Sequence, residues 1–135
     1  MTTFKELESA AGGTTQPLAA ILDALTYNDQ GLIAAVAQDA KTRQVLMMAW
    51  MDRTAIERTL AEGYACYYSR SRKTYWQKGE SSGHVQKLVE LRFDCDGDAI
   101  LLLVEQTGPA CHTDRDSCFY LLVEGQRVRV TEDPG

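Results

Sequence analysis

The 135-residue sequence lacks the features of a membrane or secreted protein. It has no run of about 18 uncharged apolar residues that could span a bilayer. Its first eight residues, Met-Thr-Thr-Phe-Lys-Glu-Leu-Glu, contain no apolar segment of the kind that signal peptides carry. We therefore expect a cytoplasmic protein, whose four cysteines stay reduced and are better suited to metal ligation than to disulfides.

Positive charge is also scarce. Lys and Arg total 14 against 19 Asp and Glu, which gives a formal net charge of -5. Proteins that bind nucleic acid without regard to sequence gain most of their affinity by neutralising phosphates, so the acidic balance disfavours that class. Any anionic ligand should therefore meet a local basic patch. The length suits one domain with a full core, and no low-complexity segment marks a second.

The spacing of apolar residues predicts helices first and then mainly strands. Helices are expected over residues 5–11 and 17–25, and a third over 53–62, where Asp52 is the N-cap and Gly63 the stop. This pattern predicts an N-terminal helical extension over 1–27, a single domain over 28–131 and a tail over 132–135.

The remaining segments alternate between strands and polar turns. The expected strands cover residues 32–37, 44–50, 64–71, 85–93, 99–105, 119–123 and 127–131. Residues 73–83 are predicted to form a polar loop. The strands outnumber the helices and several are joined by short turns, so we expect an α+β fold built mainly on antiparallel sheet.

The segment Asp94-Cys95-Asp96-Gly97-Asp98 places three carboxylates and a thiol between two predicted strands. Asp-Gly is a strong hairpin signal, and a simple turn is the alternative to a metal site here. A turn needs only one Asp-Gly, however, whereas three carboxylates at alternate positions repel one another unless a cation lies among them. An EF-hand is disfavoured because Ala99 occupies the position that requires glycine and both flanks are strand-like.

Cys95 is a soft ligand among hard ones, and thiolates select zinc whereas carboxylates select magnesium or calcium. If the segment stays extended, its three Asp residues share one face and Cys95 points to the other. From this we derive the hypothesis that Cys95 joins Cys111 and Cys118 of a different subunit, which would place a zinc site at a dimer interface. Three thiolates would leave the fourth position of zinc open to water.

Cys111 and Cys118 lie in the polar loop 108–118, where ligands are often presented, although their spacing is looser than that of structural zinc fingers. Two buried core thiols are the alternative. The chain has only two histidines, and both lie near polar loops: His112 adjoins a cysteine, and His84 follows Ser82-Gly83. Either is a candidate general base.

Residues 67–83 form the one basic cluster of this acidic chain. They combine four cations and one anion with hydroxyls, glycines and aromatic rings, which are groups that bind phosphate and stack on bases. Solvated strand faces are the alternative for any single arginine. Taken together, the cluster predicts a phosphorylated ligand that contains a base.

These motifs, in this order over about residues 31–121, resemble phosphoribosyl-AMP cyclohydrolase. The segments that carry the resemblance are Gln44–Met51, Tyr68–Arg72, Trp76–His84, Asp94–Asp98, Gly108–His112 and Ser117–Phe119. Trp50 and Tyr75 stand where the family pattern leads us to expect Tyr and Leu, and Cys66 has no family role known to us. Residues 1–27 lie outside the resemblance.

The resemblance implies a hydrolase of histidine biosynthesis that opens the N1–C6 bond of the adenine ring of 1-(5-phosphoribosyl)-AMP by zinc-activated water. It implies an intertwined homodimer, with zinc held by Cys95 of one chain and by Cys111 and Cys118 of the other. It also implies magnesium on three aspartates and a substrate site in the basic cluster. The magnesium ligands would be Asp94, Asp96 and Asp98, and the substrate contacts Arg70, Arg72, Trp76, Lys78, Glu80 and Ser82.

Two other functional classes are considered. A zinc nucleobase deaminase also attacks C6 of adenine, but the His-x-Glu and Pro-Cys-x-x-Cys motifs of that class are missing. A zinc-stabilised RNA-binding module would use the arginines and aromatic rings of residues 67–83, but the acidic net charge predicts weak binding. For the enzyme we expect His112 to manage the proton, with His84 as the other candidate.

Overall fold

The computed structural model describes residues 3–135 and has three helices and eight strands within that range. In chain order these are α1 (Thr3–Leu7), α2 (Leu18–Ala24), β1 (Ile33–Asp39), β2 (Val45–Met51), α3 (Arg53–Glu62), β3 (Cys66–Ser69), β4 (Thr74–Gln77), β5 (Gln86–Phe93), β6 (Ala99–Gln106), β7 (Leu121–Glu124) and β8 (Arg127–Val130). The expected α+β class is confirmed, and most strand pairs are antiparallel.

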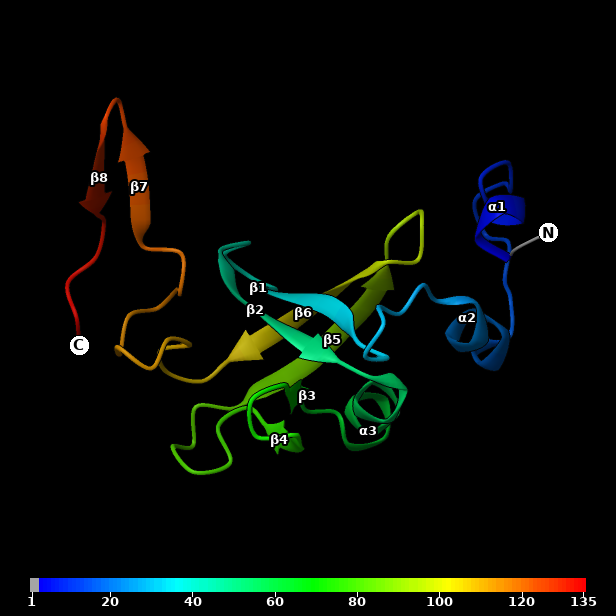
Figure 1. Cartoon of the computed structure of the whole chain (residues 1–135), viewed down its shortest axis with the longest axis horizontal. Helices are drawn as coiled ribbons and strands as arrows, with labels where there is room; N and C mark the ends of the chain where they lie inside the picture. The colour runs from blue at the N-terminus through cyan, green and yellow to red at the C-terminus, as the bar shows by residue number, and fades with distance from the viewer. Residues whose placement is uncertain (1–2) are drawn as a thin grey trace.

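Four strands form the main sheet in the order β2-β1-β6-β5 (Figure 1). β1 and β2 pair as an antiparallel hairpin, and so do β5 and β6. The two hairpins are joined by parallel pairing of β1 with β6, which runs from Ala34 opposite Ala99 to Asp39 opposite Val104. β6 therefore lies between two neighbours, which accounts for its nearly continuous apolar sequence.

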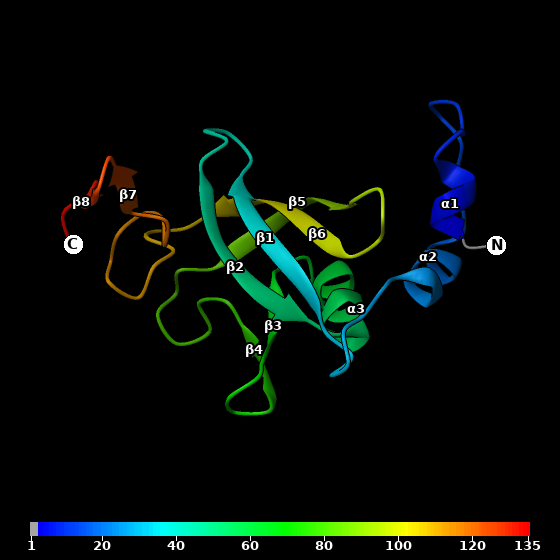
Figure 2. The same ribbon diagram turned by 45° about the horizontal axis from the view of Figure 1, so that its top comes forward.

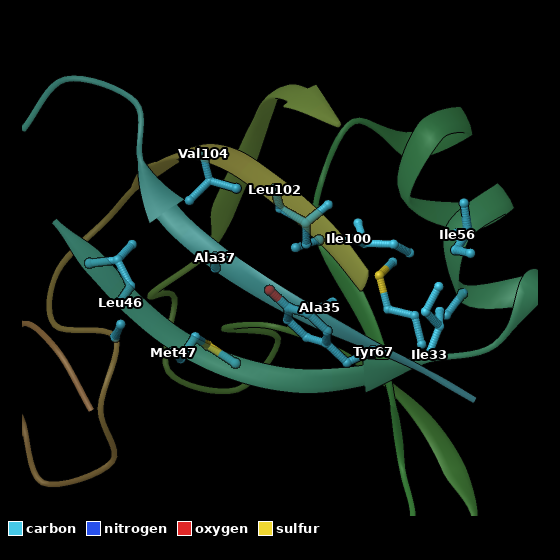
Figure 3. Close-up of a cluster of buried hydrophobic side chains, with 14 of the residues drawn as sticks. Ile33, Ala35, Ala37, Leu46, Met47, Ile56, Tyr67, Ile100, Leu102 and Val104 are labelled. Atoms are coloured by element: carbon cyan, nitrogen blue, oxygen red, sulfur yellow. The ribbon is translucent and has the colours of Figure 1, made fainter. Parts of the chain in front are cut away.

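One face of the main sheet packs against α3, β3 and β4 (Figures 1 and 2). α3 begins at Asp52, whose carboxylate accepts the N–H of Ala55 at 2.8 Å, and ends at Gly63 in the left-handed conformation. Both caps match the sequence prediction. Alternate residues of β1 point into the core, where Ala35 and Ala37 are fully buried. Figure 3 shows this cluster, with side chains from β1, β2, α3, β3 and β6.

The structure corrects the prediction that residues 73–83 form only a polar loop. Thr74–Gln77 is a strand, β4, which pairs with β3 so that Tyr67 lies opposite Trp76. The two rings lie 5.1 Å apart between centroids. Aromatic pairs across two strands stabilise a hairpin. Polar residues flank Tyr75 and Trp76, so the composition of this segment did not predict a strand.

A buried polar network ties β3 to the edge of the main sheet. Tyr67 is fully buried, and its hydroxyl donates to Gln86 Oε1 at 2.6 Å. The Gln86 amide in turn donates to Gln106 Oε1 at 2.9 Å. Buried polar groups are costly unless they are hydrogen-bonded, so this network fixes how β3 sits against β5 and β6.

The N-terminal segment supplies part of the same core. α1 covers Thr3–Leu7 instead of the predicted 5–11, and residues 1 and 2 of the predicted extension lie outside the described residues. Leu22 and Leu25 are buried in one cluster with residues of the sheet. The domain boundary at residue 27 and the tail over 132–135 stay predictions. No helix within residues 3–135 is long and apolar enough to cross a membrane.

β7 and β8 form a hairpin of their own, which we call the C-terminal ribbon (residues 121–130). It extends away from the main sheet, at the opposite end of the molecule from α1 (Figure 1). All eight of its strand residues are exposed.

Candidate functional site

The Asp94–Asp98 segment is a tight turn between β5 and β6. The N–H of Asp94 donates to the Ala99 carbonyl at 3.1 Å, and the N–H of Gly97 donates to the Asp94 carbonyl at 3.2 Å. Gly97 has a φ of 68°, which favours glycine. The premise that the segment is extended is therefore wrong, and strand alternation does not determine which way its side chains point. The strand flanks agree with our exclusion of an EF-hand.

Two of the three carboxylates of this turn interact directly. Burial opposes ionisation of Asp94, but hydrogen bonds from Asp98 and from the backbone N–H groups of residues 97–99 lower its pKa. The pKa of Asp98 is raised, because its carboxyl hydrogen-bonds to Asp94 and faces the charges of Asp94 and Asp96. Negative charge is therefore crowded at this turn, and ionisation of one carboxyl opposes ionisation of the other.

The N-terminal segment packs directly on this turn, a contact that the sequence analysis missed. Gly97 is buried, and a Cβ built on it would lie 2.5 Å from the ring of Phe4. The N–H of Thr26 donates to the Gly97 carbonyl at 2.7 Å. A neighbouring pocket of about 300 Å³ includes Cys95 in its wall. Its lining residues are Phe4, Leu7, Glu8, Ile21, Phe93, Asp94 and Cys95.

Cys111 and Cys118 are brought together by the loop after β6. The thiol of Cys111 is buried, and its sulfur accepts hydrogen bonds from Cys118 and from the Thr113 hydroxyl, the latter at 3.0 Å. Burial opposes ionisation of Cys111, but these hydrogen bonds outweigh it and lower its pKa. Partial burial and the neighbouring Cys111 raise the pKa of Cys118 to about 11. Cys111 is therefore the thiol that ionises first.

This cysteine loop is fixed to the body by hydrogen bonds. The Cys118 N–H donates to the Leu46 carbonyl at 2.7 Å, and the Ser117 hydroxyl donates to the Val45 carbonyl at 2.6 Å. The Lys78 ammonium donates to the Ala110 carbonyl at 2.7 Å and favours ionisation of Cys118. The two cysteines are thus held against β2 with a cation beside them.

The two histidines take different positions relative to the cysteine loop. The ring of His84 lies against Gly108, where a Cβ would come within 2.7 Å of it. The Gln106 amide donates to the His84 carbonyl at 3.1 Å, which holds the backbone of that residue. His112 is exposed and follows Cys111 directly. Both histidines therefore lie at the same loop as the cysteine pair.

Part of the basic cluster lines a pocket of about 510 Å³. The Arg70 guanidinium lies over the ring of Trp50, 4.8 Å from its centroid. The pocket is lined by Gln30, Ala49, Trp50, Tyr68, Ser69, Arg70, Ser71 and Trp76. Of the predicted substrate contacts, only Arg70 and Trp76 line this pocket. The sequence analysis had singled out Trp50 because it differs from the family pattern. Nothing in the sequence pointed to Gln30 as a pocket residue.

The other predicted substrate contacts lie outside this pocket. The Ser69 hydroxyl accepts the N–H of Arg72 at 3.2 Å. Glu80 accepts the N–H of Gln77 at 3.4 Å, and Ser82 accepts the N–H of His84 at 3.2 Å. Glu80 and Ser82 thus stabilise the loop between β4 and β5.

Cys95 and the Cys111–Cys118 pair lie at opposite ends of β6 (Figures 1 and 2). β6 has eight residues, which at about 3.3 Å each span about 26 Å. Zinc binds sulfur at about 2.3 Å, so thiolates of one site lie within about 4 Å of each other. Within residues 3–135, no three His, Cys, Asp or Glu side chains are gathered so that they could hold a metal ion, and this holds for the aspartates of the turn as well as for the thiols.

The part of the chain that carries these sites is similar to known proteins. A family model described as phosphoribosyl-AMP cyclohydrolase matches residues 47–120, which include the basic cluster, the turn and the cysteine loop. A phosphoribosyl-AMP cyclohydrolase of Alkalilimnicola ehrlichii is 59% identical over 131 residues, covering 97% of this chain and 92% of that protein. One of Hydrogenovibrio crunogenus is 53% identical over 132 residues, covering 98% and 90%.

We predict that replacing Gly97 by Ala disturbs the turn by displacing Phe4. Left-handed backbone alone should cost about 1–2 kcal/mol of unfolding free energy, and the clash with the ring adds to it. The matched control is Gly63→Ala, which has a φ of 80° and nothing within 4 Å of the new Cβ. Denaturant unfolding should show a larger loss for Gly97→Ala than for the control.

The second half of this test uses the Phe4→Ala background. There the clash is removed, so the loss caused by Gly97→Ala should fall to that of Gly63→Ala. An unchanged difference between the two glycine variants in this background would show that Phe4 does not pack on the turn.

Proposed function

Because the chain belongs to the phosphoribosyl-AMP cyclohydrolase family of enzymes, we propose that it is the hydrolase of histidine biosynthesis that opens the N1–C6 bond of 1-(5-phosphoribosyl)-AMP. The product is the corresponding imidazole carboxamide nucleotide. Ribosylation at N1 places positive charge on the purine, and this makes C6 electrophilic. The enzyme therefore needs a positioned nucleophilic water, a base, and contacts for two phosphates and a purine.

The observation that carries the proposed mechanism is the paired thiols of Cys111 and Cys118. They are hydrogen-bonded to each other, one has a lowered pKa, and both are held against β2. Thiolates are soft ligands that suit zinc, and a thiol gives up its proton when it binds the metal. Two donors do not complete a zinc site, so we propose that Cys95 of a second copy supplies the third and that the enzyme is a homodimer. The length of β6 supports the proposed dimer, because it keeps the chain's own Cys95 away from the other two thiols.

Zinc in such a site would supply a polarised water as the nucleophile. Three thiolates give the centre a formal charge of -1, so it acidifies water less than a site made of histidines. A base at the site would help for that reason. We assign this role to His112, which follows Cys111 and is exposed, with His84 as the other candidate.

The carboxylates of the turn have the chemistry of a hard-cation site. Asp94 and Asp98 hydrogen-bond to each other and shift each other's pKa in opposite directions, as carboxylates do when they are crowded. These carboxylates do not form a gathered set of three ligands within residues 3–135. We therefore propose that Asp96 joins Asp94 and Asp98 when magnesium binds there, and that the ion orients a phosphate or hydroxyl of the substrate. Both predicted metals would then share one turn, in which Cys95 is exposed and forms part of the wall of the pocket beside Phe4.

The pocket over Trp50 is the proposed substrate site. Arg70 stacks on Trp50, and the pocket also offers the Tyr68 and Trp76 rings with the hydroxyls of Ser69 and Ser71. Cations with hydroxyls suit phosphate, and aromatic walls suit a purine. We propose that Arg70 and Arg72 bind phosphate. Lys78 would position the cysteine loop through Ala110 as well as contacting substrate.

We predict that zinc sites can be rebuilt from two damaged chains. Cys95→Ser and Cys118→Ser should each lose zinc and ring-opening activity when produced alone. When they are co-expressed with different tags, the mixed dimer holds one intact site, so about a quarter of all sites should recover at random pairing. Zinc content and an absorbance assay of ring opening measure this recovery.

A second pair of variants serves as the matched control. Co-expressed Cys111→Ser and Cys118→Ser place both lesions on the same half of the site, so no mixed dimer contains an intact set. If the Cys95 and Cys118 pair recovers no more activity than this control, the shared zinc site is wrong.

For the base, we predict that His112→Ala lowers kcat by about 10²–10⁴ with zinc content unchanged. His84→Ala should have a smaller effect, because the ring of His84 packs on Gly108. Steady-state kinetics with zinc analysis distinguish the two residues. Near-normal turnover of His112→Ala together with a large loss for His84→Ala would transfer the role to His84.

A further inference from the structure

The residues that follow the C-terminal ribbon return the chain to the cysteine loop (residues 108–118). The backbone N–H and the hydroxyl of Thr131 both donate to the Tyr120 carbonyl, at 2.9 and 3.2 Å. These bonds close the base of the ribbon, and both views show the C-terminal end of the chain beside the loop that follows β6 (Figures 1 and 2). Glu132 is half-buried there. It lies outside residues 47–120, which the family model matches.

Glu132 contacts the cysteine loop through both its main chain and its side chain. Its carbonyl accepts the Nε–H of Arg115 at 2.7 Å, and its carboxylate accepts the N–H of Asp116 at 2.9 Å. Hydrogen bonds to a carboxylate are charge-assisted and stronger than those between neutral groups. The Arg115 guanidinium also lies over the Tyr120 ring, 4.0 Å from its centroid. Arg115 is therefore held from two sides and Asp116 by its backbone.

The same two residues hold the backbone around Cys111. The Arg115 carbonyl accepts the N–H of Cys111 at 3.1 Å, and the Asp116 carbonyl accepts the N–H of Ala110 at 3.3 Å. The Cys111 carbonyl accepts the N–H of Asp114 at 3.0 Å, and Asp114 has a φ of 66°, in the left-handed region. The segment thus folds back on itself, and Arg115 and Asp116 form the side of it that Glu132 contacts.

The two cysteines of the pair are anchored to different parts of the molecule. Cys118 is bound directly to β2 through its backbone N–H. The backbone N–H of Cys111 is bound to Arg115 within the loop, and Lys78 holds the neighbouring Ala110. The position of Cys111 relative to Cys118 therefore depends on how firmly the segment around Arg115 is held.

We propose that Glu132 is a positioning residue for the metal site, which holds residues 115 and 116 and thereby keeps the Cys111 thiol beside that of Cys118. That the metal is zinc rests on the proposed function. Groups that fix metal ligands without touching the metal change its affinity by about 10–100-fold. A loop that is already ordered loses less conformational entropy when it binds. The bond to Asp116 is exposed, so we expect an effect at the lower end of this range.

The first test measures the zinc affinity of the full-length protein by competition with a chromophoric chelator. Glu132→Ala removes the acceptor of the Asp116 N–H and should weaken zinc binding about tenfold. Glu132→Gln keeps a side-chain oxygen as the acceptor and should restore most of the lost affinity. Glu124→Ala is the matched control, because it removes the same carboxylate from an exposed ion pair with Arg129 on the ribbon. It should bind zinc within about twofold of wild type.

Hydrogen exchange of the loop amides gives a second readout, which is independent of catalysis. The amides of Ala110 and Cys111 do not bond to Glu132 themselves, but they bond to the residues that Glu132 holds. They should exchange faster in Glu132→Ala than in wild type, and Glu124→Ala should leave them unchanged. Circular dichroism establishes that each variant is folded. If Glu132→Ala is not folded, Glu132→Asp takes its place, because it withdraws the carboxylate by one methylene.

Wild-type zinc affinity of folded Glu132→Ala would overturn the positioning role. Equal losses of affinity in Glu132→Ala and Glu132→Gln would also overturn it, because Gln retains the acceptor. Wild-type protein that binds no zinc would instead overturn the proposed function, and the exchange of the Ala110 and Cys111 amides would still decide whether Glu132 holds the loop.

Discussion

The length and position of β6 are the constraint on which the rest of this structure depends. Together with β1 it joins the two hairpins of the main sheet, since it pairs in parallel with β1 and antiparallel with β5. The carboxylate turn precedes it and the cysteine loop follows it. A strand flanked on both sides is rigid, so the two sets of ligands are held at opposite ends of a strand about 26 Å long. A zinc site that needs all three thiols must therefore use two chains.

The separation of the two sets of ligands explains why each set is fixed in place by contacts of its own. The cysteine loop is fixed to β2 and to Lys78, and the turn is fixed by Phe4 and Thr26, so each half of the proposed site is preorganised on its own chain. The N-terminal segment thereby acquires a structural role at the turn. Assembly and ligation would then stabilise each other, because forming one contact places the groups for the other.

Local sequence signals determined much of this fold. Asp52 and Gly63 set the bounds of α3, and the apolar run of β6 identified an interior strand. Tertiary contacts determined what was missed. β4 depends on pairing with the aromatic residues of β3, and the position of α1 depends on packing at Gly97. The extended form assumed for residues 94–98 failed because Gly97 adopts a left-handed conformation that closes the turn.

Some functional residues could likewise be predicted from the sequence, and others could be found only from the fold. Cysteine, aspartate and arginine clusters were visible in the sequence because their chemistry is distinctive, whereas Gln30 enters the pocket over Trp50 only through the fold. The central claim is that zinc is held between two chains, and native mass spectrometry of the purified protein tests it most directly. The account predicts two zinc ions in the dimer and none in the monomer released on dilution. Monomers that retain one zinc each would contradict it.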